Sequence, residues 1–274
     1  MEAGTLYICP TPIGNLDDIT LRVLKILGEV DLIAAEDTRH TLRLLNHFEI
    51  KKPMTSYHEH NIREKGPQLV QQMQEGRSIA LVSDAGMPGI SDPGQDLIRL
   101  AIREGIEVVG LPGPSAALLA LVISGLPTEK FAFEGFLPSK GTDRKKALER
   151  IRDEKRTLIF YESPHRIASS LKDMLDILGD RQASLSRELT KHFEETMRGG
   201  LEKLLSVAEE RNLKGEMVVV VSGAEEVEPE EVDVKRELRK LLDGGMSKKE
   251  AVKEVVRVHG VPRNQVYQDS LDLD

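Results

Sequence analysis

The sequence predicts an α/β protein made of two α/β lobes followed by a small C-terminal helical module. Short apolar or β-branched runs alternate with amphipathic stretches, which is typical of successive strand and helix units. A break rich in proline and glycine at residues 111–114 divides this pattern into two halves. An acidic, proline-containing segment at residues 225–231 then separates the second half from a basic region with helical periodicity.

Strands are expected wherever a short apolar run is bounded by polar or turn-forming residues. Residues 217–221 are continuously apolar, as in strands that are buried on both faces. The expected strands are residues 6–9, 32–35, 79–82, 107–110, 131–136, 158–161, 183–186 and 217–221.

Helices are expected where apolar residues recur every three or four positions. Several of these stretches end near a glycine, which is a common helix stop before a new strand. They are residues 20–27 ending at Gly28, residues 97–102 ending near Gly105, and residues 167–178 ending at Gly179.

The two breaks predict the domain organisation. The expected parts are an N-terminal α/β lobe at residues 1–113, a C-terminal α/β lobe at 114–224, an acidic linker at 225–233 and a basic helical module at 234–274.

Composition limits the function classes. Aromatic residues make up 4% of the chain and tryptophan is absent, which argues against an aromatic platform for stacking bases. Cys9 is the single cysteine, so an internal disulfide and a cysteine metal cage are excluded, and we expect a buried small residue there and no bound metal. The N-terminal residues lack the pattern of a signal peptide, and no apolar stretch is long enough to span a bilayer. A cytoplasmic protein is expected.

Charge is distributed unevenly. The net charge is −8, but residues 234–268 hold nine basic and four acidic residues, a local balance of +5 that leaves −13 for the rest. A basic module on an acidic body suggests that a polyanion binds at one end, although a solvated helix face fits the charges equally well. Residues 140–156, with eight basic and four acidic residues, leave the same two alternatives of guiding RNA or facing solvent.

The basic module is expected to contain three short helices in a helix-turn-helix-like arrangement. Residues 234–242 form the first, with apolar residues on one face. Ser247 and Glu250 have the spacing of a capping box at the start of the second, which should bury Ala251, Val255 and Val258 and end at Gly260. Pro262 suits the first turn of the third, which holds Val266 and Tyr267.

Two loops rich in glycine and proline are candidates for a ligand site. Residues 83–94 (SDAGMPGISDPG) lie between an expected strand and an expected helix, where α/β folds bind ligands. Glycines allow a ligand to approach the backbone closely and prolines stiffen the loop, while the phosphate-binding glycine motifs are absent. Residues 110–117 form the second loop, in which Ser115 is a plausible helix cap. A tight turn and a domain linker are the respective alternatives.

Eight ordered motifs carry a family resemblance: LYICPTPIGN (6–15), AEDTR (35–39), SYHEH (56–60), residues 82–94, residues 111–116, EGFLP (134–138), FYESPHR (160–166) and SREL (186–189). Together they resemble the tetrapyrrole-methylase-type superfamily of S-adenosylmethionine-dependent methyltransferases. Within it, they are similar to the branch that methylates a cytidine 2′-hydroxyl of 16S ribosomal RNA. The resemblance covers roughly residues 6–224, with the basic module matching less distinctively.

The resemblance implies a cofactor, S-adenosyl-L-methionine, held in a cleft between two lobes, and a homodimer acting on ribosomal RNA within the small subunit. It places cofactor contacts at Pro12, Ile13, Asp84, Gly86, Met87, Ser115, Ala116, Tyr161, Glu162, Gly215, Glu216 and Met217. The residue patterns independently indicate only the two glycine- and proline-rich loops. Tyr161 and Met217 fit the core equally well.

Methylation of a ribose hydroxyl would be helped by a general base or by a cation that stabilises the developing alkoxide. Residues 36–40 directly follow an expected strand and offer both kinds of group, while His58 and His60 alternate like strand neighbours. Each residue taken alone also fits a salt bridge or a cap. The candidates are Glu36, Asp37, Arg39, His58, Glu59, Arg187 and Glu188.

Two other functions remain open from the sequence. A methyltransferase for tetrapyrroles or other small molecules would share the cofactor loops, although AEDTR, SYHEH and the basic module argue against it. A ligand-sensing regulator that binds nucleic acid without catalysis would explain the basic module.

Overall fold

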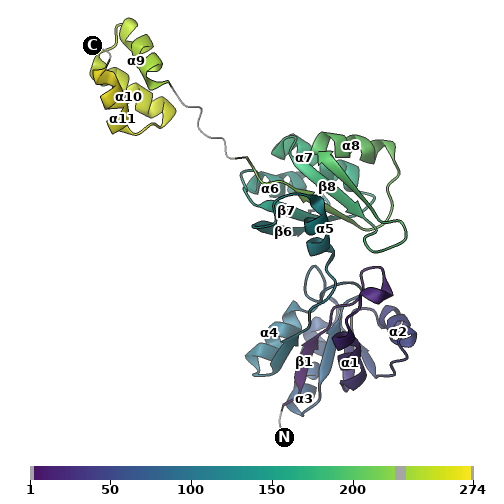
Figure 1. Ribbon diagram of the computed structural model, residues 1–274. Coiled ribbons are helices and arrows are strands. Elements are labelled where there is room, and N and C mark those ends of the chain that lie inside the picture. Colours follow the sequence, from purple (N-terminus) through teal and green to yellow (C-terminus); the bar gives the residue numbers. More distant parts are fainter. Residues whose placement is uncertain (1–2, 226–232, 273–274) are drawn as a thin grey trace. The chain divides into compact units, whose positions relative to one another are not determined.

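The computed structural model describes residues 3–225 and 233–272, shown in Figure 1. The chain forms two compact units, Met1–Ala224 and Glu225–Asp274. The first contains two α/β lobes and the second is a helical module, which confirms the predicted fold class. Of the predicted acidic linker, residues 226–232 lie outside the described residues.

The N-terminal lobe contains a parallel sheet with the strand order β3-β2-β4-β1-β5. Helices α1 and α2 pack on one face and α3 and α4 on the other, as Figure 1 shows. The strands are Thr5–Ile8 (β1), Leu32–Ala35 (β2), Met54–Ser56 (β3), Ile79–Val82 (β4) and Glu107–Gly110 (β5). The helices are Leu21–Glu29 (α1), Thr38–His47 (α2), Ile62–Gln74 (α3) and Gln95–Arg103 (α4), with a short 3-10 helix at Leu16–Asp18.

The central strand β4 explains why its segment is continuously apolar. Ile79 and Leu81 face α3 and α4, whereas Ala80 and Val82 face α1 and α2. All four side chains are almost fully buried, because alternate residues of a strand point to opposite faces and both faces are covered by helices.

Strands β1 and β4 lie side by side, but the chain leaves them in opposite directions. From β1 it crosses to β2 on one side, and from β4 it crosses to β5 on the other. Their carboxyl ends therefore form a topological switch point, where open α/β sheets bind ligands.

The C-terminal lobe contains a mixed sheet with the order β6-β7-β10-β8-β9, in which β10 is antiparallel to both of its neighbours. Helices α6, α7 and α8 cover one face and α5 packs on the other. The strands are Phe131–Phe136 (β6), Thr157–Glu162 (β7), Gln182–Arg187 (β8), Glu195–Gly200 (β9) and Met217–Val221 (β10). The helices are Ala116–Ser124 (α5), Gly141–Arg150 (α6), Ile167–Leu178 (α7) and Leu201–Glu210 (α8).

The antiparallel direction of β10 brings its first residue to the ends of two other strands. Met217 pairs with Glu162 of β7 and with Arg187 of β8. The segment before β10 therefore lies at the same sheet edge as the loops that follow β7 and β8.

Several local predictions differ from the structure. The edge strands β3 and β9 were not predicted, because β3 has three half-buried residues and β9 has the polar, glycine-containing sequence ETMRGG. Helix α1 continues through Gly28 to Glu29, and Gly28 does not adopt the left-handed φ with which glycine ends a helix. His58 and His60 are not strand neighbours: they follow β3 in the turn that precedes α3.

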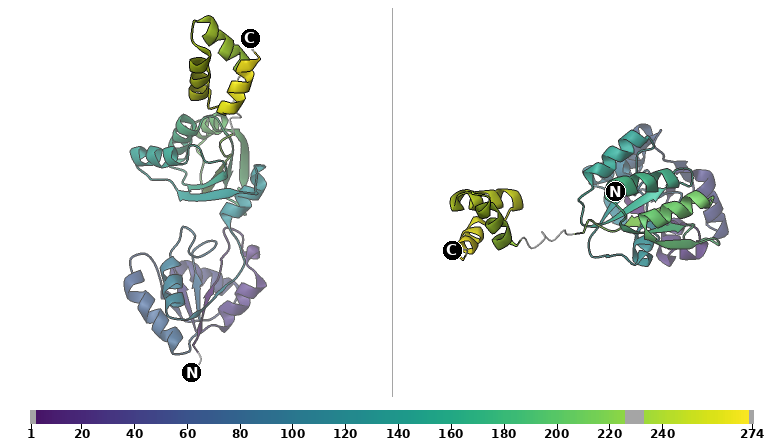
Figure 2. Two further views of the ribbon diagram at one scale, coloured as in Figure 1. Left: turned by 90° about the vertical axis from the view of Figure 1, so that its left-hand side faces the viewer. Right: turned by 90° about the horizontal axis from the view of Figure 1, so that it is seen from above.

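The C-terminal module consists of α9 (Val234–Asp243), α10 (Lys248–His259) and α11 (Arg263–Leu271), and Figure 2 shows these helices from two sides. They pack around a small core of their own. The predicted capping box of Ser247 and Glu250 is present, and Gly260 ends α10 in the left-handed conformation. The predicted burial of Val258 is wrong, since 55% of its surface is exposed. No helix in the described parts of the chain is long and apolar enough to cross a membrane.

Candidate active site

The loops after β1 and β4 are joined at the switch point. Thr11 and Gly86 exchange two backbone hydrogen bonds, of 2.9 and 3.0 Å. The Thr11 hydroxyl, which is buried, also donates to the carbonyl oxygen of Ser83 at 3.0 Å. The two loops therefore form one wall.

A cavity of about 610 Å³ lies against this wall and continues to the strand ends of the C-terminal lobe. Its volume falls in the range of a small-molecule or cofactor site. It is lined by Ile13, Ala85, Gly86, Met87, Ile90, Ser91, Asp92, Ser115, Ala116, Phe136, Tyr161, Glu162, Ser163, Pro164, Glu188, Leu189, Lys191, Gly215, Glu216, Met217 and Val218.

The loop after β4 needs its glycines. Gly86, Gly89 and Gly94 have φ values of 79°, 84° and 143°, which residues with a Cβ rarely adopt. At Gly94 a Cβ would also lie 2.9 Å from Leu81 Cδ2. Ser91, which lines the cavity, has a φ of 60° without being a glycine, and such backbone strain is often found at functional sites.

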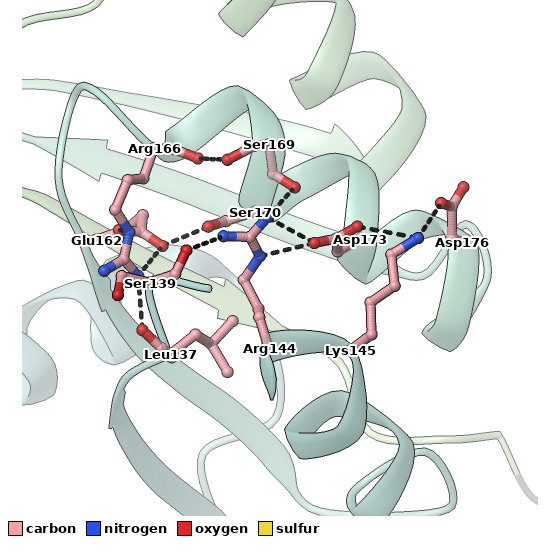
Figure 3. A network of polar contacts seen from close by, with 10 residues as sticks. All are labelled: Leu137, Ser139, Arg144, Lys145, Glu162, Arg166, Ser169, Ser170, Asp173 and Asp176. Atoms are coloured by element: carbon pink, nitrogen blue, oxygen red, sulfur yellow. Dashed lines mark hydrogen bonds and ion pairs between the residues drawn. The ribbon is translucent and has the colours of Figure 1, made fainter. Parts of the chain in front are cut away.

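Glu162 closes the cavity on the side of the C-terminal lobe, and its carboxylate is held from inside the protein, as Figure 3 shows. It accepts hydrogen bonds from the Ser163 backbone N–H at 2.8 Å and from the Ser170 hydroxyl, and it forms an ion pair with Arg166 at 3.1 Å. Arg166 in turn donates to the carbonyl oxygen of Leu137 at 2.6 Å. Glu162 therefore fixes the end of β7.

A second charged group lies where β8 ends and β10 begins. Lys191 Nζ is 2.9 Å from Glu188 Oε1 and 3.0 Å from Glu216 Oε2. The hydrogen bond from Lys191 lowers the pKa of Glu188. Glu188 and Thr190 have positive φ values of 52° and 66°, so the backbone of this turn is also unusual.

Acidic residues gather beside the loop after β4. The backbone N–H of Asp84 donates to Glu36 Oε2 at 3.3 Å, and that of Asp37 donates to Asp84 Oδ1 at 3.1 Å. Burial, together with the negative charge of Glu36, raises the pKa of Asp92 to about 7. Burial also raises the pKa of Glu36. Asp92 thus lines the cavity as a carboxyl group that can take up or release a proton near neutral pH.

The structure brings most of the predicted cofactor residues together. Pro12 and Asp84 lie apart, in a smaller cavity of about 190 Å³ beside His40 and Thr41. The predicted residues that line the larger cavity are Ile13, Gly86, Met87, Ser115, Ala116, Tyr161, Glu162, Gly215, Glu216 and Met217.

The predicted catalytic residues are dispersed. Of them, Glu188 lines the larger cavity. Glu36 and Asp37 belong to the acidic group described above, and Arg39 forms an exposed ion pair with Asp37 at 2.6 Å. Arg187 is paired with Glu195 at 2.8 Å. The backbone N–H of His58 donates to Asn61 Oδ1 at 2.9 Å, and Glu59 is exposed.

Sequence reasoning missed several lining residues. Asp92 lies within the glycine- and proline-rich loop that the sequence singled out, so its position was a usable signal. Leu189 is the last residue of the SREL motif, and Lys191 lies two residues after it. Phe136 is the last residue of β6 and lies in the EGFLP motif, which was a usable signal, although its apolar type alone also fits a core position.

Comparison with known proteins matches both parts of the chain. The family model Tetrapyrrole (Corrin/Porphyrin) Methylases matches residues 5–205, and the model RsmI C-terminal HTH domain matches residues 228–274. The chain is 52% identical over 272 residues to Ribosomal RNA small subunit methyltransferase I of Halalkalibacterium halodurans, covering 97% of this chain and 94% of that protein. The protein of the same name from Streptococcus pyogenes serotype M3 is 48% identical over 275 residues, covering 99% and 96%.

The chain belongs to the ribosomal RNA small subunit methyltransferase I family, within the tetrapyrrole methylases. It is therefore a methyltransferase, and the predicted family resemblance is confirmed. Among solved structures, uroporphyrin-III C-methyltransferase from Thermus thermophilus, complexed with S-adenyl homocysteine, has a TM-score of 0.56 at 18% identity, covering 80% of this chain and 97% of that one. At this identity the likeness supports the fold of the two lobes.

Proposed function

We propose that this protein transfers a methyl group from S-adenosylmethionine to the ribose 2′-hydroxyl of a cytidine in small-subunit ribosomal RNA. The observation that carries the proposal is the cavity at the switch point, in a chain whose relatives are ribosomal RNA methyltransferases over nearly their whole length. A ribosomal RNA substrate also places the reaction in the cytoplasm.

The residues of the cavity fit this cofactor. Bound S-adenosylmethionine supplies a methyl group that its sulfonium already activates. Ile13, Met87 and Leu189 offer apolar surface for the adenine of the cofactor. Asp92 and Glu216 offer acidic groups to its positive charge. The glycines of the loop after β4 allow close approach of the backbone.

We assign the cofactor contacts to the predicted residues that line the larger cavity. Pro12 and Asp84 line the neighbouring smaller cavity, and Asp84 accepts a hydrogen bond from the backbone N–H of Asp37. We therefore assign these two residues to the support of the site and not to contact with the cofactor. The protein's own contribution to the reaction is to align the reacting atoms and to exclude water.

Asp92 is the carboxyl group that best fits the role of general base. It lines the cavity, and its pKa lies near neutral pH. At neutral pH a large share of this carboxyl group is therefore ionised and can accept the proton of the ribose hydroxyl. Glu162 is less suited, because its oxygens are engaged by Ser170, Arg166 and a backbone N–H. Glu188 is engaged by Lys191 in the same way.

We propose a homodimer in which helix α5 contributes to the interface. Leu118 and Val122 lie four residues apart on one face of α5 and expose 51% and 71% of their surface. Replacing Val122 by Glu should shift the protein to monomers in sedimentation velocity. Leu21→Glu on α1, where 85% of the leucine is exposed, is the matched control and should leave the dimer intact.

The reaction is tested with S-adenosylmethionine labelled on its methyl group. The protein is incubated with 30S particles from cells lacking the enzyme, with free 16S RNA, with DNA and with a porphyrinoid. The proposal expects label on ribosomal RNA, in a cytidine whose 3′ linkage resists alkali, because the 2′-hydroxyl that attacks the phosphate is blocked. Label on a base would contradict the ribose assignment, and label on the porphyrinoid alone would contradict the RNA assignment.

A further inference from the structure

A second cavity lies on the N-terminal lobe, in the groove between α3 and α4. It measures about 430 Å³ and is lined by Ile62, Arg63, Pro67, Asp96, Arg99, Leu100 and Arg103. We call it the arginine groove.

Helix geometry directs the charges of α4 into this groove. Asp96, Arg99, Leu100 and Arg103 follow the spacing of one helix face, so they lie in a row along α4. Arg63 faces them from the first turn of α3. The lining of the groove thus contains three guanidinium groups and one carboxylate.

The arginines of the groove are poorly compensated. Among the residues that the structure describes, no acidic group lies within ion-pair distance of Arg63 or Arg99, and the acidic partner of Arg103 is Glu104 at 3.3 Å. The chain outside residues 234–268 carries a balance of −13. A local excess of arginine on such an acidic body attracts an anion to this place rather than to the surface in general.

The groove begins close to the candidate active site. Both helices start at the carboxyl edge of the parallel sheet, because each follows a strand of that sheet. The segment that leads into α4 contains Met87 and Asp92, which line the larger cavity. A strand of nucleic acid lying in the groove would therefore reach the switch point at one end.

We propose that the arginine groove binds backbone phosphates of the RNA beside the nucleotide to be methylated. This inference rests on the proposed RNA substrate. Guanidinium groups bind phosphate oxygens through two parallel hydrogen bonds, and such contacts position the RNA without reading its sequence. The groove thereby orients the strand, while the cavity at the switch point carries out the reaction.

The test compares Arg63→Gln/Arg99→Gln with Arg22→Gln on α1, an exposed arginine on the opposite face of the sheet. Glutamine retains much of the side-chain length and a similar helix propensity, so circular dichroism should be unchanged. The double variant should raise the KM for 16S RNA about tenfold with little change in kcat, and leave the affinity for S-adenosylhomocysteine unchanged. The slope of log K for RNA binding against log salt should fall by about 1.4, because each phosphate contact to a single strand contributes about 0.7.

An unchanged KM and salt slope in the double variant would overturn the inference. A loss of binding to 30S particles without a loss of binding to naked RNA would do the same, and would indicate a ribosomal protein as the partner. RNA binding is measured by fluorescence anisotropy without methyl transfer. A wild-type protein that binds RNA through the groove but leaves it unmethylated would therefore contradict the proposed reaction and leave the groove supported.

Discussion

The backbones of Thr11 and Gly86 are joined by a reciprocal pair of hydrogen bonds, 2.9 and 3.0 Å long, which couples the first loop of the protein to the loop after β4. Gly86 adopts a left-handed φ of 79° in this pairing, a conformation that residues with a Cβ rarely adopt. A Cβ there would lie 3.4 Å from Ile13 Cγ2, an ordinary van der Waals contact, so the restriction at this position comes from the backbone.

Replacing Gly86 by Ala should therefore weaken cofactor binding. The matched control is Gly105→Ala, since Gly105 has a similar φ of 73° but a Cβ there would meet nothing within 4 Å. Both variants should lose about 1 kcal/mol of stability from the left-handed backbone. Only Gly86→Ala should raise the Kd for S-adenosylhomocysteine, by about tenfold, in calorimetry. Equal affinities in the two variants would remove the loop from the binding site.

The raised pKa of Asp92 predicts how activity depends on pH. If Asp92 accepts the proton as a carboxylate, kcat/KM should fall as pH drops below about 7, by tenfold per pH unit at the lower end. Asp92→Asn should abolish this dependence and lower kcat by about 10² to 10⁴. In Glu36→Gln the fall of kcat/KM at low pH should remain but move to lower pH, since the charge of Glu36 helps to raise the pKa of Asp92. If Asp92→Asn kept the wild-type dependence of kcat/KM on pH, Asp92 would be excluded as the base.

The same carboxyl group should make the protein less stable as pH rises, whereas it makes the enzyme more active. A carboxyl whose pKa is raised on folding binds more protons in the native state, so the free energy of unfolding falls as pH rises from about 4 to about 7. Denaturation at pH 5 and pH 8 should show this loss in the wild type. The loss should be smaller in Asp92→Asn, which has no charge to bury at this position.

The ion pair between Arg144 and Asp173 should be important for the stability of the C-terminal lobe. Its atoms approach to 2.6 Å, and the two side chains are 7% and 9% exposed, as part of the network in Figure 3. Asp173→Ala leaves the arginine buried without its partner and should cost about 3–5 kcal/mol in chemical denaturation. Lys145 contacts both Asp173, at 3.3 Å, and Asp176, at 3.5 Å. Asp176→Ala should cost less than about 1 kcal/mol, because the pair of Asp176 with Lys145 is exposed to solvent. Similar losses in both variants would contradict this difference.

The C-terminal module should be separable from the two lobes. It has a core of its own, which contains Leu238, Val255 and Val266. Deleting residues 234–274 should leave the affinity for S-adenosylhomocysteine nearly unchanged, while RNA binding weakens and becomes less dependent on salt. Replacing Lys248, Lys249 and Lys253 by Glu should have the same effect in the full chain.

The oligomeric state of the truncated protein serves as the control, because the module could instead support the dimer. A truncated protein that remains dimeric and methylates RNA at the full rate in low and physiological salt would rule out an RNA anchor. The +5 balance would then reflect a solvated helix face.

Local sequence was sufficient where one short pattern determines a structure. The apolar run Met217–Val221 became a strand buried on both faces, and the spacing of Ser247 and Glu250 produced the capping box that begins α10. The glycine- and proline-rich segment after β4 became a wall of the main cavity. Edge strands such as β9 were missed, because their residues are half exposed and depend on a neighbouring strand for their hydrogen bonds.

Periodicity, turn chemistry and ordered motifs were enough to predict the family, the α/β order of the elements and the loops that we propose for the ligand site. Which side chains of those loops reach the cavity depends on the three-dimensional fold. Asp84 contacts the segment after β2, whereas Asp92, eight residues later, lines the cavity with a raised pKa. The pKa of Asp92 is raised by burial and by the charges of residues far away in the chain, such as Glu36 and Glu216, and local sequence patterns do not reveal which of these lie close together.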